Sequence, residues 1–335
     1  MEAIDKSNFR DIILNSVNQL TADLEFFNQL QLARRPFNKV IFCGMGGSAF
    51  IGDFLVYFKK QNYIPLSLNL PIVAHRSYDL PPETDDDSLI ICSSYSGNTE
   101  EAISSFQKAK QMGLEITGIT CGGQLADLFQ RNKTPWVKIP RNDLPPRCSL
   151  GYQLAALIKI LMAYGLLPAS AQNELVSLAE NLKPENLESE AKNLSATLLN
   201  KIPVIYVSDN NQTLARLWKI KFNENAKVPS FYNSFPELNH NEMVGWTKMA
   251  GLFSFLFLSD VNDLPPIKKR MDLTAELLKR NGAAVSFVKL GGAGALAKIF
   301  WASVFGDWLS YYLALNLGID PTPVQMVEEF KKMLK

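Results

Sequence analysis

The sequence has few of the residues that mark several large protein classes. Its 335 residues include four cysteines, Cys43, Cys92, Cys121 and Cys148, which are widely spaced and form no paired motif for zinc or redox chemistry. Basic residues number 34 and acidic residues 33, so the net charge of +1 gives no reason to expect nucleic acid as a partner. With two histidines and no closely spaced histidine or aspartate motif, we predict no metal site.

Long hydrophobic runs are also missing. The longest, near residues 249–258, falls well short of the ~20 residues that a membrane span needs, so we expect no membrane partner. The first residues lack the basic-then-apolar pattern of a signal peptide, and the dispersed thiols fit a reducing compartment. We therefore expect a cytoplasmic protein, and the chain length suggests two domains.

Hydroxyl side chains are concentrated in one stretch, Ser93 to Glu101. The apolar run before it predicts a buried strand, and the residues after Glu100 have the apolar spacing of a helix. Backbone amides at a helix start favour an anion, so this turn suits a phosphate held by hydrogen bonds. A helix N-cap is the alternative interpretation, but a cap needs one such residue and this turn has five of serine, threonine and asparagine.

A glycine-rich turn, Gly44 to Ala49, follows an earlier predicted strand over residues 39–43. Its glycines could bring backbone amides against a ligand, or they could belong to a dinucleotide fingerprint. We find no acidic residue about twenty positions on, at the end of a second strand, so the fingerprint is weak. Ligands of parallel sheets bind beyond the carboxyl ends of the strands, and we expect both turns to face one ligand there.

Strands and helices alternate in both halves of the chain, which predicts an α/β fold. We expect two similar domains, residues 1–165 and 166–335, each a doubly wound, mostly parallel sheet flanked by helices. Further helices are expected over residues 8–31, 150–166, 213–224, 266–280, 295–317 and 324–334. Further strands are expected over residues 73–76, 116–120, 202–207, 253–258 and 285–288.

Five polar residues are candidates for chemistry. Arg147 follows two prolines in a stiff loop, where a positioned role competes with that of a solvated charge. Glu224 is expected at the end of a helix, an unfavourable place for a carboxylate that suits a proton acceptor, although a solvated glutamate fits equally well. Glu237 and Glu242 are rivals for this role. His240 lies between them and could transfer protons or be a structural histidine.

Taken together, five segments resemble the bifunctional phosphoglucose/phosphomannose isomerases of the sugar isomerase (SIS) superfamily. The segments follow the same order over nearly the whole chain: residues 44–48, 94–99, 146–152, 223–227 and 236–242. The resemblance implies two SIS domains, a homodimer with shared active sites, and conversion of glucose 6-phosphate or mannose 6-phosphate to fructose 6-phosphate.

The resemblance also implies a role for each matched residue. The substrate phosphate would be held by Gly47, Ser48, Ser94, Ser96 and Thr99. Arg147 would steady the enediolate, and Glu224 would move a proton between carbons 2 and 1. His240 of the partner subunit would help to open the sugar ring. Lys331, or its neighbour Lys332, would assist, and Thr322 is the candidate for mannose tolerance. This chemistry needs no cofactor.

Two other functions remain open from the sequence, and a third has weaker support. A non-catalytic SIS protein that binds a sugar phosphate as a regulator would keep the serine turn but would not need Glu224, Arg147 and His240 together. An isomerase of the glucosamine 6-phosphate synthase type would carry a glutaminase domain, for which this chain has no room. A dinucleotide-dependent oxidoreductase would rest on the glycines alone.

Overall fold

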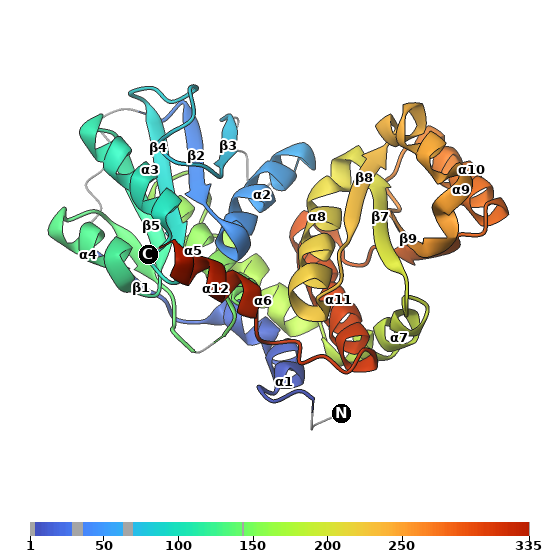
Figure 1. Ribbon diagram of the computed structural model, residues 1–335. Helices are drawn as coiled ribbons and strands as arrows, with labels where there is room; N and C mark the ends of the chain where they lie inside the picture. Colours follow the sequence, from blue (N-terminus) through green and yellow to red (C-terminus); the bar gives the residue numbers. More distant parts are fainter. Residues whose placement is uncertain (1–3, 29–35, 63–69, 143, 335) are drawn as a thin grey trace. The chain divides into compact units, whose positions relative to one another are not determined.

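The computed structural model describes residues 4–28, 36–62, 70–142 and 144–334. The chain forms two compact units: an N-terminal unit, Asn15–Lys183, and a C-terminal unit, Met1–Leu14 with Pro184–Lys335. Each unit contains its own sheet between helices (Figure 1), so the predicted α/β fold with mostly parallel sheets is confirmed. The domain boundary expected at residue 165 stays a prediction.

The N-terminal unit is built on a six-stranded sheet of order β1-β6-β5-β4-β2-β3, in which only β1 runs antiparallel to its neighbour. Its strands are β1 (Glu25–Phe27), β2 (Lys39–Gly44), β3 (Ile72–His75), β4 (Ser88–Ser94), β5 (Glu115–Thr120) and β6 (Trp136–Lys138). Its helices are α2 (Gly46–Lys60), α3 (Glu100–Gln111), α4 (Gly123–Arg131), α5 (Leu150–Ala163) and α6 (Ala171–Asn181).

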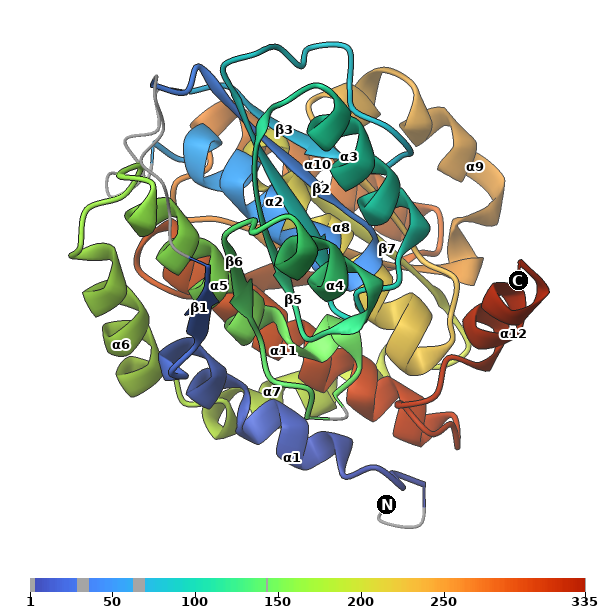
Figure 2. The same ribbon diagram turned by 90° about the vertical axis from the view of Figure 1, so that its left-hand side faces the viewer.

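Central strand β4 is buried along its whole length, as expected of a parallel strand covered on both faces. Helices α3 and α4 cover one face of the sheet (Figure 2). Ile90 and Cys92 pack there with Phe106 and Phe129. Helices α2 and α5 pack on the sheet from the other side. The Cys92 thiol is fully buried, and its neighbour Cys43 and that burial raise its pKa, so it packs as a small apolar group.

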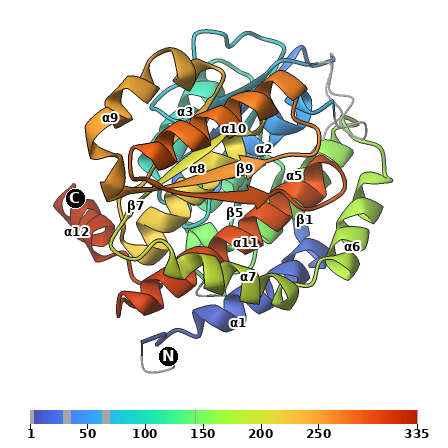
Figure 3. The same cartoon turned by 90° about the vertical axis from the view of Figure 1, so that its right-hand side faces the viewer.

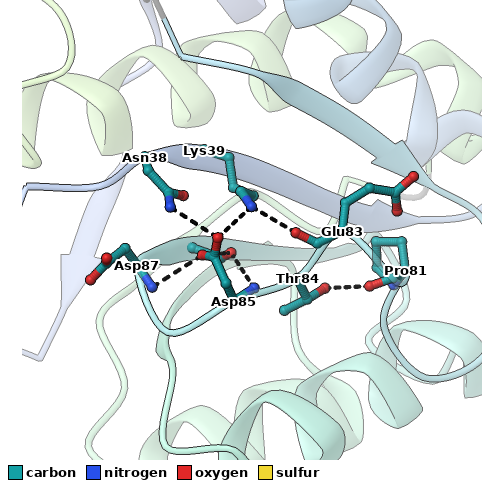
Figure 4. Close-up of polar contacts among 8 residues, drawn as sticks. Asn38, Lys39, Pro81, Glu83, Thr84, Asp85 and Asp87 are labelled. Atoms are coloured by element: carbon teal, nitrogen blue, oxygen red, sulfur yellow. Dashed lines mark hydrogen bonds and ion pairs between the residues drawn. The ribbon is translucent and has the colours of Figure 1, made fainter.

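The amino ends of β2 and β4 are fastened by a polar cluster around Asp85 (Figure 4). The Asp85 carboxylate accepts hydrogen bonds from Lys39 Nζ at 2.5 Å and from Asn38 Nδ2 at 2.9 Å, and Lys39 also donates to the Glu83 carbonyl. The hydrogen bond from Lys39 is the largest of the contacts that hold the pKa of Asp85 well below its usual range. This edge of the sheet is the one opposite the predicted phosphate turns.

The helix expected over residues 8–31 is wrong beyond residue 14. Helix α1 (Phe9–Leu14) belongs to the C-terminal unit, a 3-10 turn covers Ser16–Thr21, and residues 25–27 form strand β1. The described apolar residues are buried or half-buried, but they pack in two different units. Phe9 packs on Tyr311 in the C-terminal unit, whereas Phe27 stacks on Trp136 in the N-terminal unit with ring centroids 4.8 Å apart. Residues 29–31 of the expected helix lie outside the described part.

The C-terminal unit has a four-stranded, fully parallel sheet of order β10-β9-β7-β8. Its strands are β7 (Ile202–Ser208), β8 (Phe231–Phe235), β9 (Phe253–Ser259) and β10 (Ala284–Lys289). Besides α1, its helices are α7 (Glu185–Ala196), α8 (Gln212–Lys221), α9 (Trp246–Met249), α10 (Pro265–Arg280), α11 (Gly294–Asn316) and α12 (Gln325–Met333).

Helix α10 covers one face of this sheet, and α11 lies with α7 and α8 on the other (Figure 3). Helix α11 is hydrophobic all round because it is buried on nearly every side. It also carries Lys298 and Asp307, both buried. In the described part of the chain, no helix combines the length and apolar character that crossing a bilayer requires.

The predicted helix over residues 213–224 changes form before its end. Helix α8 stops at Lys221, and residues Phe222–Ala226 continue as a π-helical segment. A second irregular region follows β8, where 3-10 turns at Glu237–His240, Glu242–Gly245 and Ala250–Leu252 frame the short helix α9. The predicted catalytic residues Glu224 and His240 lie in these two irregular regions.

Candidate active site

The two predicted phosphate turns lie at one edge of the N-terminal sheet. Strands β2 and β4 are parallel neighbours, with Gly44 opposite Ser93 at their carboxyl ends. Helix α2 begins directly after β2, and the residues after Ser94 turn into α3. The structure therefore brings Ser48 next to the serine turn, where its Oγ accepts a hydrogen bond from the Tyr95 backbone N–H at 2.9 Å.

The turn hydroxyls are organised by hydrogen bonds that leave donors available. Ser94 Oγ lies 2.8 Å from Thr99 Oγ1 and accepts from the Gly97 N–H, so one hydrogen of this hydroxyl pair remains free for another acceptor. The Ser48 and Ser96 hydroxyls each accept from a backbone N–H and keep their own hydrogen. Three hydroxyl donors at one turn suit the oxygens of a phosphate.

Glycine is required at two positions of this region. Gly97 has φ of 71°, and a Cβ there would lie 1.7 Å from the Gly122 carbonyl oxygen. A Cβ on Gly47 would lie 2.9 Å from the backbone nitrogen of Arg147. The start of α2 thus packs directly against the loop that carries Arg147, and the Arg147 side chain is buried. Four of the predicted residues, Gly47, Ser48, Ser94 and Arg147, come together through these contacts.

The helix-cap interpretation of the turn is not supported by its contacts. Thr99 is the N-cap residue of α3, yet its side chain makes no capping hydrogen bond and is turned to Ser94 instead. Asn98 accepts from the Gln124 N–H at 3.0 Å and so tethers the start of α4. Ser96 is exposed at the tip of the turn.

Glu224 lies on the π-helical segment after α8, half-buried. π-Helical turns are rare and are found mainly at functional sites. The segment ends at Lys227, whose backbone is left-handed (φ 56°) and whose Nζ donates to the carbonyls of Asp320 and Pro321 at 2.8 and 2.9 Å. The loop between α11 and α12 therefore lies beside the segment that carries Glu224.

His240 and Glu224 lie toward opposite edges of the C-terminal sheet. Strands β7 and β8 are parallel, so the connection through α8 returns the chain from the carboxyl end of β7 to the amino end of β8. Glu224 is near the end of that return, whereas His240 follows the carboxyl end of β8. Its side chain is exposed, and the His240 ring forms no hydrogen bond or ion pair with any residue that the structure describes.

The rival carboxylates have other partners. Glu242 accepts from the Tyr206 hydroxyl at 2.6 Å and from the Asn233 amide, and Trp246 donates to the same hydroxyl. Burial, and then the Glu242 carboxylate, raise the pKa of Tyr206 above its usual range, so the tyrosine remains a donor. The exposed Glu237 accepts from Asn241 at 2.7 Å. Both carboxylates therefore accept hydrogen bonds from residues within or next to the irregular region that follows β8.

The predicted lysines lie on α12, and both Lys331 and Lys332 are exposed. The structure therefore gives no preference between them. Thr322 lies in the loop before α12, where its backbone N–H donates to Asp320 Oδ1 at 3.0 Å. In the described residues, no group of three histidine, cysteine, aspartate or glutamate side chains has an arrangement that could hold a metal ion.

Sequence reasoning missed a set of buried polar residues behind Glu224. These are Lys221, Asn225, Asp307 and Ser310, which contact one another between α8 and α11. The motif around Glu224 contains Asn225, but nothing in the sequence links it to residues over 80 positions away on an apolar helix.

A cavity of about 320 Å³ at the ends of β9 and β10, next to Lys268 and Lys289, contains none of the predicted site residues.

Comparison with known structures defines the class of fold. The chain aligns with the C-terminal domain of glucosamine-fructose-6-phosphate aminotransferase from Francisella tularensis with a TM-score of 0.68, covering 93% of this chain and 95% of that one. The sequence identity is 16%, so this likeness shows the fold alone. Residues 187–334 match the family described as the bacterial phospho-glucose isomerase C-terminal SIS domain. The C-terminal part of the chain is therefore similar to an SIS domain.

Two relatives define the family more closely. The bifunctional phosphoglucose/phosphomannose isomerase of Caldicellulosiruptor bescii is 38% identical over 309 residues, which cover 89% of each chain. The protein of the same name from Aquifex aeolicus is 34% identical over 92% of this chain and 96% of its own. This chain belongs to the bifunctional phosphoglucose/phosphomannose isomerase family.

Proposed function

We propose that this protein is an aldose–ketose isomerase that converts glucose 6-phosphate and mannose 6-phosphate to fructose 6-phosphate. The observation that carries the proposal is the 38% identity to a relative of that name over 89% of both chains. The non-catalytic alternative is not favoured, because the chain keeps Glu224, Arg147 and His240 together with the hydroxyl turn.

In the proposed reaction, the serine turn binds the phosphate and thereby orients the sugar. Ser48, Ser96 and one member of the hydrogen-bonded pair Ser94 and Thr99 donate hydroxyl hydrogens to the phosphate oxygens, with the backbone at Gly47 close by. Binding energy from a group remote from the reacting carbons is used to hold those carbons in place. The available hydroxyl hydrogens described above support this role.

Glu224 is the proposed base. Its carboxylate takes a proton from carbon 2 of the open-chain aldose and returns it to carbon 1, by way of an enediolate. Arg147 stabilises the negative charge that develops on the enediolate oxygens. Lys331, or its neighbour Lys332, is the proposed assisting lysine. The engagement of Glu242 with Tyr206 and Asn233 supports Glu224 over its rival.

We propose further that the protein is a homodimer in which His240 of one subunit helps to open the sugar ring at the other subunit's site. The topology supports this sharing, because Glu224 and His240 lie toward opposite edges of one sheet. A mixture of Glu224→Gln and His240→Ala variants should regain activity, since some mixed dimers would own one intact site. Demonstrated subunit exchange without regained activity would contradict the shared site. The cytoplasmic location stays a prediction.

The test of the function itself is a pair of assays on purified protein. Each 6-phosphate is supplied separately, and fructose 6-phosphate is measured by a coupled reaction. Turnover with both substrates is the expected result. Binding of a sugar phosphate, measured by calorimetry, without turnover of either substrate would favour the regulatory alternative instead.

A further inference from the structure

We propose that the buried polar residues Lys221, Asn225, Asp307 and Ser310, here called the α8–α11 network, position the Glu224 carboxylate for proton transfer. The proposal rests on the proposed function, because it assumes that Glu224 is the base. None of the four residues needs to touch substrate, so they are positioning residues. They act by fixing the π-helical segment that carries Glu224.

The network attaches both sides of Glu224 to one helix. Lys221, three residues before Glu224, has its Nζ 2.6 Å from Asp307 Oδ1, and the exposed fractions of these side chains are 1% and 10%. Asn225, the next residue after Glu224, is fully buried. Its Nδ2 donates to Ser310 Oγ at 2.9 Å and lies 3.4 Å from the same Asp307 oxygen.

The support on the far side of the segment is also tight. Asn223 Nδ2 donates to the Val228 carbonyl at 2.9 Å, and Lys227 holds the loop after α11 through two carbonyls. Helix α11 is itself buried nearly throughout, so it cannot shift without disturbing the core. Glu224 is therefore a half-buried residue between chain neighbours that are held by hydrogen bonds and an ion pair.

Stability alone does not explain this arrangement. A buried ion pair gains little over well-packed apolar residues, since removing two charges from water offsets their attraction. A π-helical segment likewise gives up regular helical hydrogen bonds. Both features make sense if a carboxylate must be held within about 0.5 Å of its productive position.

The network should act on turnover rather than on binding. The hydroxyl turn that binds phosphate shares no residue with the network, so KM should change little. Displacing a catalytic group by about 1 Å lowers the rate by roughly 10²-fold. We therefore expect kcat to fall by about 10- to 100-fold when the network is broken, with KM within about threefold of its original value.

Two variants break the network. Asn225→Ala removes the amide that ties the segment to α11, and the pair Lys221→Met with Asp307→Leu replaces both charges without leaving one unpaired. Ser310→Ala is a milder variant that keeps the proposal testable if the first two fold poorly. The matched control is the pair Lys298→Met with Asp260→Leu, which removes the other buried ion pair of α11, away from Glu224. The control should lose stability without the selective fall in kcat.

A double-mutant cycle with Glu224→Gln separates the possible outcomes. If the network acts through Glu224, Asn225→Ala should lower kcat in the original background and change it by less than about twofold when Glu224 is already glutamine. Equal fold-losses in both backgrounds, or a folded Asn225→Ala with unchanged kcat, would overturn the positioning role. Normal turnover by Glu224→Gln would instead show that the assigned base is wrong.

Discussion

The two units bury polar groups of different kinds. Among the described residues of the N-terminal unit, Arg147 is the one buried charged side chain, and the other buried polar groups are hydroxyls and amides. The part of the C-terminal unit that the structure describes buries six charged residues: Asp5, Lys221, Asp260, Asp263, Lys298 and Asp307. Similar layers of helices and parallel strands therefore support two chemically different interiors.

This difference matches the division of roles that we propose. A phosphate can be held by neutral hydroxyl and amide donors, which are numerous at the turns after β2 and β4. A base needs a fixed carboxylate, and two of the six buried charges, Lys221 and Asp307, belong to the network that we propose supports Glu224. Arg147 is the exception, and a buried cation fits the proposed role of meeting the charge that develops in the reaction.

The largest expected effect on turnover follows from replacing Arg147. Arg147→Met should lower kcat by roughly 10²–10³-fold, since it removes a donor to the developing oxyanion. Arg147→Lys should recover part of the loss because it keeps the charge without the forked geometry. Steady-state kinetics on both variants, with thermal unfolding as a control for folding, tests this. Similar losses in the Arg147→Met and Arg147→Lys variants, at unchanged melting temperature, would show that the forked geometry matters rather than the charge.

Next in size is the effect of a side chain on Gly97. Gly97→Ala would force a left-handed alanine whose Cβ meets the Gly122 carbonyl at 1.7 Å, so the turn must move. We expect kcat/KM to fall by about 10²-fold and the melting temperature to drop. Gly113→Ala is the control, since Gly113 has φ of 70° with open space around its Cβ position. It should cost stability alone.

The effects of deleting single hydroxyl groups on substrate binding should be smaller. Ser94→Ala or Thr99→Ala breaks the 2.8 Å hydroxyl pair that orients the donor offered to the phosphate, which should cost about 1–3 kcal/mol in substrate binding. The effect should appear in KM and in calorimetric titration with inorganic phosphate. Wild-type KM in both single variants and in the double variant would remove the serine turn from the site.

The smallest expected effect is on the pH dependence of stability, through Glu188 in the C-terminal unit. Burial raises the pKa of Glu188, but hydrogen bonds from Arg10 and Tyr312 outweigh it and leave that pKa below its usual value. The stability from this contact should be present above the unfolded pKa of about 4.3 and should be lost as pH falls through the lower folded value. The pair is part-exposed, so we expect under about 1 kcal/mol. Glu188→Gln should melt below the original protein at pH 7 and match it near pH 2.

The sequence predicted the long elements well and the short ones poorly. Strands β2, β4, β5, β7 and β9 appear where apolar runs predicted them, because runs of that kind have one stable place in a buried parallel sheet. Strands β1 and β6 have three residues each and exist through their pairing with one another and with β5. No local pattern signals such strands, and the continuous spacing over residues 8–31 hid a change of unit.

The candidate site was predictable where its residues are contiguous. The serine turn shows itself by hydroxyl density, and the structure joins it to Ser48 through the pairing of β2 with β4. The support behind Glu224 was not predictable, because Asp307 lies on a helix whose apolar pattern gives no sign of a buried charge. The π-helical form of Phe222–Ala226 was not predicted either, since the apolar spacing over residues 213–224 indicated an ordinary helix.

The most direct test of the account is solvent deuterium incorporation into the sugar phosphate. Glu224→Gln keeps the size of the side chain but cannot accept the proton, so exchange at carbons 1 and 2 should fall by at least ~10²-fold with near-normal substrate binding. Glu237→Gln and Glu242→Gln should keep exchange, since those carboxylates hold Asn241, Tyr206 and Asn233. Normal exchange by Glu224→Gln together with its loss in either other variant would contradict the assignment of the base.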